Sequence, residues 1–78
     1  MVLERPPHVK YRREDGFGLV YDHENYGYDD ATLSTVNEVV VEVLERVETG
    51  SHTYEELTRE FSSRAIDVML EEGYLQDA

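Results

Sequence analysis

A β-hairpin signal near the N-terminus constrains the fold of this chain more than any other feature. The dipeptide Asp15-Gly16 separates two short stretches, 8–13 and 17–21, in which apolar and polar residues alternate. Asp-Gly is favoured in tight hairpin turns, and alternation is the period of a strand with one buried face. The sequence therefore predicts two antiparallel strands joined by a turn at residues 14–16.

The residues that follow predict a third strand and hence a small sheet. Residues 22–25 are polar and include Asn25, which tolerates the left-handed conformation found in turns. Tyr26 and Tyr28 then point to one side, with Gly27 between them. A short strand with a central glycine is typical of a sheet edge. We therefore expect a three-stranded antiparallel meander that ends on the strand of Tyr26 and Tyr28.

A long helix is expected next, because apolar residues recur at three- and four-residue steps. We expect it to be capped by Asp29, Asp30 or Thr32 and to end before Gly50. Its predicted buried face comprises Leu33, Val36, Val40, Val43, Leu44 and Val47.

Two shorter helices are predicted to complete the chain. Thr53 and Glu56 have the spacing of a capping box, which opens a helix. Another helix is expected to begin at Ser62 or Ser63 and to end at Gly73. The order β-β-β-α-α-α predicts an α+β fold of the winged-helix-like kind, with a meander followed by three helices.

A chain of 78 residues has room for one small core, so one domain is expected. Residues 1–7 are predicted to form an N-terminal arm, because Pro6 and Pro7 lack the backbone donors that a helix or an inner strand requires. Residues 8–78 are then a single winged-helix-like, peptide-binding domain.

The charge excludes some partners. The chain has 18 acidic and 7 basic residues, a net charge of −11, and this field repels nucleic-acid phosphates and anionic lipids. The candidate recognition helix 62–73 carries Arg64 against three acids, which also disfavours DNA. Two explanations of the acidity stay open, a halophilic cytoplasm and a basic partner. The single lysine beside six arginines favours the first. Residues 1–13 have a net charge of +3 and are expected to pair with the acidic remainder.

No arrangement typical of catalysis is present. Cysteine is absent, and the three histidines, His8, His23 and His52, lack the spacing of metal ligands. The serines have no catalytic motif around them and are expected to cap helices. We therefore expect no enzymatic activity, no metal and no cofactor. No apolar run approaches the roughly 20 residues of a membrane span, so a cytoplasmic protein without membrane contact is expected.

Two segments resemble a known family. Residues 12–21 read Arg-Arg-Glu-Asp-Gly-Phe-Gly-Leu-Val-Tyr, and residues 70–75 read Leu-Glu-Glu-Gly-Tyr-Leu. Both resemble the peptide chaperones of mycofactocin and pyrroloquinoline quinone biosynthesis, over roughly residues 9–75. These belong to the RiPP recognition elements, where RiPP denotes ribosomally made, post-translationally modified peptides. The resemblance implies a non-enzymatic domain that captures a precursor-peptide leader as an added strand. It also implies delivery to a modifying enzyme, commonly a radical S-adenosylmethionine protein.

The resemblance further implies a groove between the third strand and the third helix. Position in these segments assigns it the side chains of Tyr26, Tyr28, Arg64, Ile66, Asp67 and Leu70. Alternatively, the tyrosines fill the interface between sheet and helices. The expected partners are the precursor-peptide leader and the modifying enzyme, and the protein itself is expected to be a monomer or weak dimer. Two further hypotheses are a winged-helix regulatory or interaction module and an accessory subunit that docks through exposed Val39 and Val41.

Overall fold

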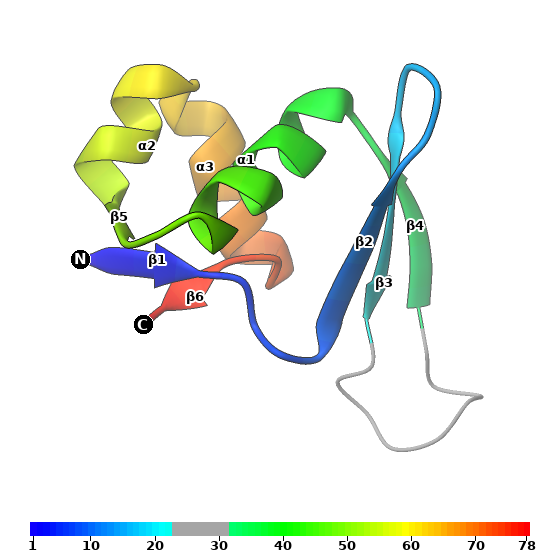
Figure 1. Ribbon diagram of the computed structural model, residues 1–78, viewed down its shortest axis with the longest axis horizontal. Helices are drawn as coiled ribbons and strands as arrows, with labels where there is room; N and C mark the ends of the chain where they lie inside the picture. The colour runs from blue at the N-terminus through cyan, green and yellow to red at the C-terminus, as the bar shows by residue number, and fades with distance from the viewer. Residues whose placement is uncertain (23–31) are drawn as a thin grey trace.

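The structure, a computed structural model, describes residues 1–22 and 32–78, which form two small antiparallel sheets and three helices (Figure 1). The meander has the spatial order β2-β3-β4, with β2 at Val9–Arg13, β3 at Gly18–Asp22 and β4 at Thr32–Val36. The second sheet places β1 (Val2–Glu4) between β5 (His52–Thr53) and β6 (Gln76–Asp77). The helices are α1 (Glu38–Glu48), α2 (Tyr54–Glu60) and α3 (Ser63–Glu72). The predicted α+β fold, a meander followed by three helices, is confirmed; the winged-helix likeness stays a prediction.

The predicted hairpin is present. β2 and β3 pair in register from Val9 with Asp22 to Arg13 with Gly18. Beyond the last pair, the Glu14 N–H donates to the carbonyl oxygen of Phe17 at 2.9 Å. Asp15 and Gly16 form the tip, where Gly16 has a φ of 82° that glycine adopts without steric cost.

The prediction for the start of the first helix was wrong, because residues 32–36 form a strand. The third strand is β4, which pairs with β3 along its whole length, and the predicted strand around Tyr26 and Tyr28 lies outside the described residues. Residues 32–36 are mostly β-branched, a composition that suits a strand. Helix α1 begins only at Glu38, because Asn37 caps it by accepting the Val39 N–H at 2.8 Å.

Helix α1 is buried on two sides, which explains the uninterrupted run of valines at 39–41. The meander covers one side of α1, and α3 lies on another (Figure 1). Val41 packs against Gly18 of β3 and is fully buried, so the hypothesis of an exposed Val41 was wrong. The sequence predicted one apolar stripe, which is the pattern of a helix with a single covered face, whereas α1 is covered on two sides.

The N-terminal residues also differ from the prediction. β1 is the middle strand of the second sheet, and its Leu3 side chain is 1% exposed. The Met1 carbonyl accepts the Tyr54 N–H at 2.9 Å, and the Val2 carbonyl accepts the Ala78 N–H at 2.8 Å. The two ends of the chain therefore lie side by side (Figure 1). The prolines follow the strand instead of interrupting it, so their missing donors do not affect its pairing.

The predicted helix boundaries after α1 are confirmed. Thr53 and Glu56 form the capping box of α2, and the Ser62 hydroxyl accepts the Ala65 N–H at 3.1 Å to cap α3. Gly73 ends α3 in the left-handed conformation, with a φ of 83°. The core between these helices, α1 and the sheets contains Leu3, Val9, Val20, Val43, Leu44, Val47, Leu57, Ile66, Met69 and Leu75.

Candidate functional site

A groove lies between the first turns of α1 and α3, beside the end of β4. Its cavity volume is about 310 Å³, and its lining residues are Asn37, Val39, Val40, Ser62, Arg64, Ala65 and Val68. We call it the α1–α3 groove. Asn37 directly follows β4, which is the last strand in the order β2-β3-β4 of the described residues, so the groove begins where this edge strand ends. An apolar hollow beside a strand edge is suited to an extended polypeptide.

The helical period of α3 decides which of its side chains reach the groove. Arg64, Ala65 and Val68 share one face within a turn, whereas Ile66 and Met69 point into the core and are fully buried. The burial of Ile66 and Met69 therefore decides which side of α3 faces the groove.

The structure brings one of the predicted site residues to this groove. Arg64 lines it and is exposed. Ile66 lies in the core, Leu70 packs against the core, and Asp67 accepts a 2.7 Å hydrogen bond from the Tyr54 hydroxyl. That hydrogen bond raises the pKa of Tyr54. The other two predicted residues, Tyr26 and Tyr28, lie outside the described residues, so the binding roles of all six stay predictions.

Four apolar lining residues were missed by the sequence interpretation: Val39, Val40, Ala65 and Val68. A signal for two of them was present, since Val68 is four positions from Arg64 and three from Ala65, and these spacings make residues neighbours on a helix. No local signal pointed to the valines of α1, because their place depends on where α1 begins.

Basic residues near the N-terminus attach β2 and the segment before it to α1. Arg5 pairs with Glu48, Nε to Oε1, at 2.7 Å, and the Tyr11 hydroxyl donates to Glu48 Oε2 at 2.6 Å. Arg13 pairs with Glu45 at 2.6 Å. The expected pairing of the basic segment with the acidic remainder is thus confirmed for Arg5 and Arg13.

These contacts shift two pKa values. Burial, together with the hydrogen bond to Glu48, raises the pKa of Tyr11 to about 12. The same hydrogen bond, with help from Arg5, lowers the pKa of Glu48. At neutral pH the hydroxyl is therefore a donor and the carboxylate an acceptor, which keeps this contact intact.

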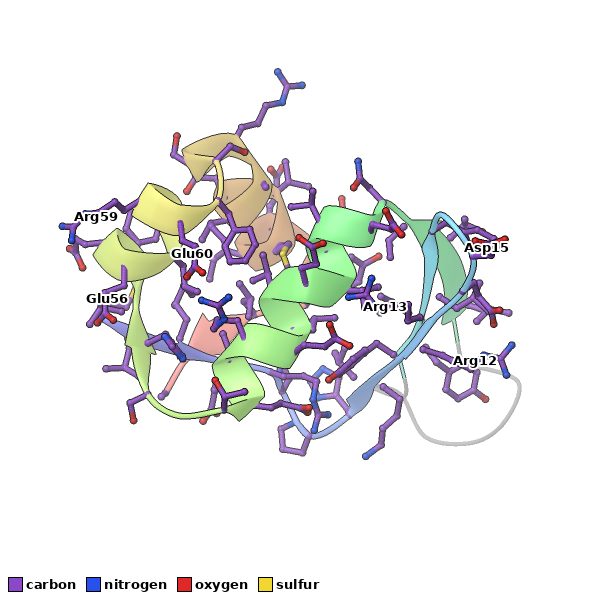
Figure 2. The ribbon with its side chains drawn as sticks, turned by 45° about the horizontal axis from the view of Figure 1, so that its top comes forward. Arg12, Arg13, Asp15, Glu56, Arg59 and Glu60 are labelled. Carbon is purple, nitrogen blue, oxygen red and sulfur yellow. The ribbon has the colours of Figure 1, made fainter. Side chains whose placement is uncertain are left out.

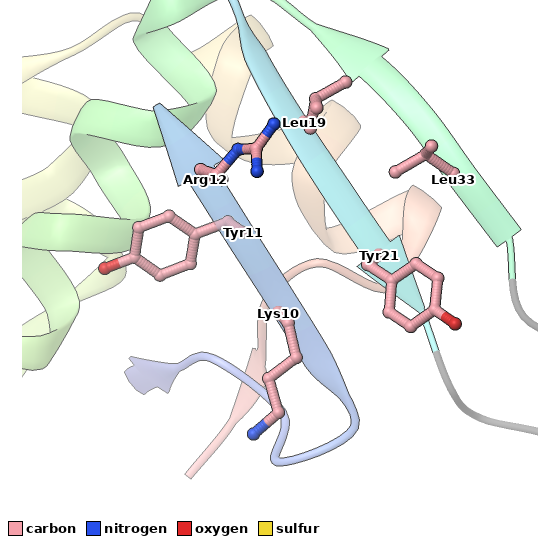
Figure 3. Close-up of a pocket in the computed structure, with 6 residues that line it drawn as sticks. All are labelled: Lys10, Tyr11, Arg12, Leu19, Tyr21 and Leu33. Carbon is pink, nitrogen blue, oxygen red and sulfur yellow. The ribbon is translucent and has the colours of Figure 1, made fainter. Parts of the chain in front are cut away.

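Two further hollows lie outside this groove. One, of about 370 Å³, lies on the meander and is lined by Lys10, Tyr11, Arg12, Leu19, Tyr21 and Leu33 (Figure 3). The other, of about 470 Å³, lies between α1 and α2 and is lined by Glu42, Glu45, Arg46, Thr49, Glu60 and Phe61. The first is apolar and basic, whereas the second is mostly acidic.

In residues 1–22 and 32–78, no three histidine or carboxylate side chains come together in a way that would hold a metal ion. None of the helices described has the length and apolar character needed to cross a bilayer. Helix α3 exposes Asp67, Glu71 and Glu72 beside Arg64, so its solvent face is acidic and disfavours phosphate.

Comparison with known proteins gives a family. A family model described as mycofactocin biosynthesis chaperone MftB-like matches residues 3–77. No curated protein and no solved structure gives a significant match. The matched range includes both segments on which the resemblance rests, 12–21 and 70–75, so the resemblance is confirmed. Across almost its whole length, the chain belongs to the MftB-like family of mycofactocin biosynthesis chaperones.

Proposed function

We propose that this protein is a non-enzymatic chaperone that binds the leader of a ribosomal precursor peptide and presents it to a modifying enzyme of the radical S-adenosylmethionine class. Membership of the MftB-like family supports a chaperone role, and such a role requires both a precursor peptide and a modifying enzyme as partners. The leader binds as a strand added to β4, and its side chains enter the α1–α3 groove.

The observation that carries this proposal is the position of an apolar groove beside an edge strand. One edge of β4 pairs with β3 from Thr32 to Val36, and β4 ends the sheet order on its other side. The outer edge of such a strand presents backbone N–H and C=O groups to an added strand. An added strand would pass Asn37, where the groove begins, so its alternate side chains could enter the groove.

The groove also indicates what the leader carries. Val39, Val40, Ala65 and Val68 provide an apolar surface that fits an aliphatic or aromatic side chain. Arg64 is the one charged residue in the lining, and it suits a carboxylate at a neighbouring leader position. A leader with an apolar anchor and a nearby acid is therefore expected to bind best.

Fluorescence anisotropy with the labelled cognate leader tests the groove. Val68→Asp places a carboxylate in the apolar lining and is expected to weaken binding at least about tenfold, or about 1.4 kcal/mol. Arg64→Glu should also weaken binding. Arg59→Glu is the matched control, because Arg59 is an exposed arginine on α2 outside the groove lining, and it should leave the affinity unchanged. Unchanged affinity in both groove variants would show that the leader binds elsewhere.

Strand addition has its own test. In an antiparallel or parallel pair, only alternate amides of a strand face its neighbour. N-methylation of one alternating set of leader amides should therefore abolish binding, whereas methylation of the other set should be tolerated. Equal effects from the two sets would rule out strand addition. If the unmodified leader fails to bind at both low and high salt, the proposed function itself is wrong.

A further inference from the structure

The outer face of the meander carries an apolar and basic surface. Residues paired across strands share a face, so Lys10, Tyr21 and Leu33 form one row, and Arg12 and Leu19 form part of the next. These five residues define the outer patch. Figure 3 shows the patch on the side of the sheet away from the helices, which lie behind it.

The opposite face of the meander packs against the helices. Gly18 contacts Val41 of α1, and Val9 and Val20 belong to the core. On the outer face, by contrast, Leu33 is 62% exposed. Tyrosine and arginine, both present in the patch, are enriched at the centre of protein–protein interfaces.

The charge of the patch differs from that of the rest of the molecule. Both of its charged residues, Lys10 and Arg12, are basic, in a chain whose net charge is −11. Arg12 pairs with Glu14, but its side chain remains 73% exposed. The hollow between α1 and α2 instead has three glutamates and one arginine. Complementary charge therefore selects an acidic partner for the outer patch.

Other occupants fit the patch less well. A nucleic acid needs several cations along its phosphates, and two cations on a chain of charge −11 do not supply them. A two-fold dimer through the patch would bring the Lys10 and Arg12 side chains of two copies together, and like charges at an interface are unfavourable.

We propose that the outer patch docks a protein surface with an apolar centre and an acidic rim, and that the modifying enzyme supplies this surface. The proposal rests on the proposed function, since it names the surface that the enzyme contacts. The α1–α3 groove lies on the helical side of the meander and the outer patch on the other. The chaperone therefore holds the leader and contacts the enzyme at the same time, as presentation requires.

The test measures two affinities for each variant, one for the labelled leader and one for the purified enzyme that modifies the cognate precursor peptide. Lys10→Glu and Leu19→Thr alter the patch on β2 and β3, away from the β4 edge. Each is expected to weaken enzyme binding at least about tenfold while leader affinity stays within about twofold. Loss of enzyme binding with leader binding retained supports the patch.

Matched controls separate the two surfaces. Arg59→Glu makes the same charge change on α2, at the far end of the molecule from Arg12 (Figure 2), and should alter neither affinity. Val68→Thr, in the groove, should weaken leader binding and leave enzyme binding unchanged. Circular dichroism melting shows which variants are folded. If Leu19→Thr unfolds, Lys10→Glu still decides the outcome.

The remaining outcomes separate this proposal from the proposed function. Unchanged enzyme affinity in the folded patch variants would show that the patch does not dock the enzyme. A wild-type protein that fails to bind the enzyme would show the same. A dimer in light scattering that Lys10→Glu dissociates also overturns the proposal, because the patch then binds a second copy. If the leader does not bind but the patch variants lose the enzyme, the proposed function fails and the docking surface stands.

Discussion

At the scale of single residues, Gly18 controls how closely the meander approaches α1. A Cβ atom added at this position would lie 2.1 Å from Val41 Cγ2 and 3.2 Å from Val36 Cγ2. Gly18 is therefore required because a side chain does not fit beside Val41. Gly16 is required because its φ of 82° lies in the left-handed region that favours glycine. Two glycines only two positions apart thus have different physical roles.

Gly18→Ala is expected to lower the free energy of unfolding by about 1–3 kcal/mol, because β3 and α1 must separate to admit the methyl group. Urea denaturation measures the change. Val41→Ala removes the methyl groups that clash, so the double variant should lose less stability than the sum of the two single variants. An additive result would show that the two residues are not in contact.

At the scale of elements, a three-residue strand makes a large contribution to the core. β1 is held by backbone pairing to β5 and β6, and Leu3 reaches the interior. Short strands at chain ends are often poorly ordered unless they are paired in this way. The sequence did not predict β1, because the prolines that follow it are typical of extended, unpaired segments.

Leu3→Ala is therefore expected to cost about 2–5 kcal/mol of unfolding free energy through the cavity that it leaves. Val2→Ala is the matched control on the same strand, where the side chain is 36% exposed, and it should cost less than about 1 kcal/mol. Denaturant unfolding of the two variants gives the comparison. Similar small costs for both would mean that β1 does not anchor the core.

At the scale of the whole molecule, electrostatic repulsion opposes folding. The ion pairs of Arg5 with Glu48 and Arg13 with Glu45 join β2 and the segment before it to α1, yet the net charge is −11. Self-repulsion of this kind destabilises the compact state and is reduced by salt. The halophilic explanation of the acidity stays a prediction, and it has a measurable consequence.

Potassium chloride raised to about 1 M, where the screening length falls to about 3 Å, is expected to increase the melting temperature by several degrees. Differential scanning fluorimetry across a salt series measures this. Replacing the exposed carboxylates Glu55, Glu71 and Glu72 by glutamine should make the increase smaller, because less repulsion remains to be screened. A melting temperature that falls with salt would show that the attractive pairs outweigh the repulsion.

The sequence by itself determined the elements that depend on local chemistry. The Asp15-Gly16 turn, the capping box of Thr53 and Glu56, the Ser62 cap and the Gly73 end are all present, because each is set by backbone dihedral angles and neighbouring hydrogen bonds. The motif around the hairpin was also sufficient to indicate the family that the comparison confirms.

Only the tertiary structure decided whether residues 32–36 form a strand or a helix, and it therefore decided where the groove lies. Leu33 and Val36 have a helical spacing and lie on opposite faces of the strand, and it is pairing with β3 that selects the strand. The same pairing delays α1 to Glu38 and places Val39 and Val40 beside α3. Long-range contacts of this kind leave no local pattern, so Ile66 was expected in a groove whose lining from α3 is Arg64, Ala65 and Val68.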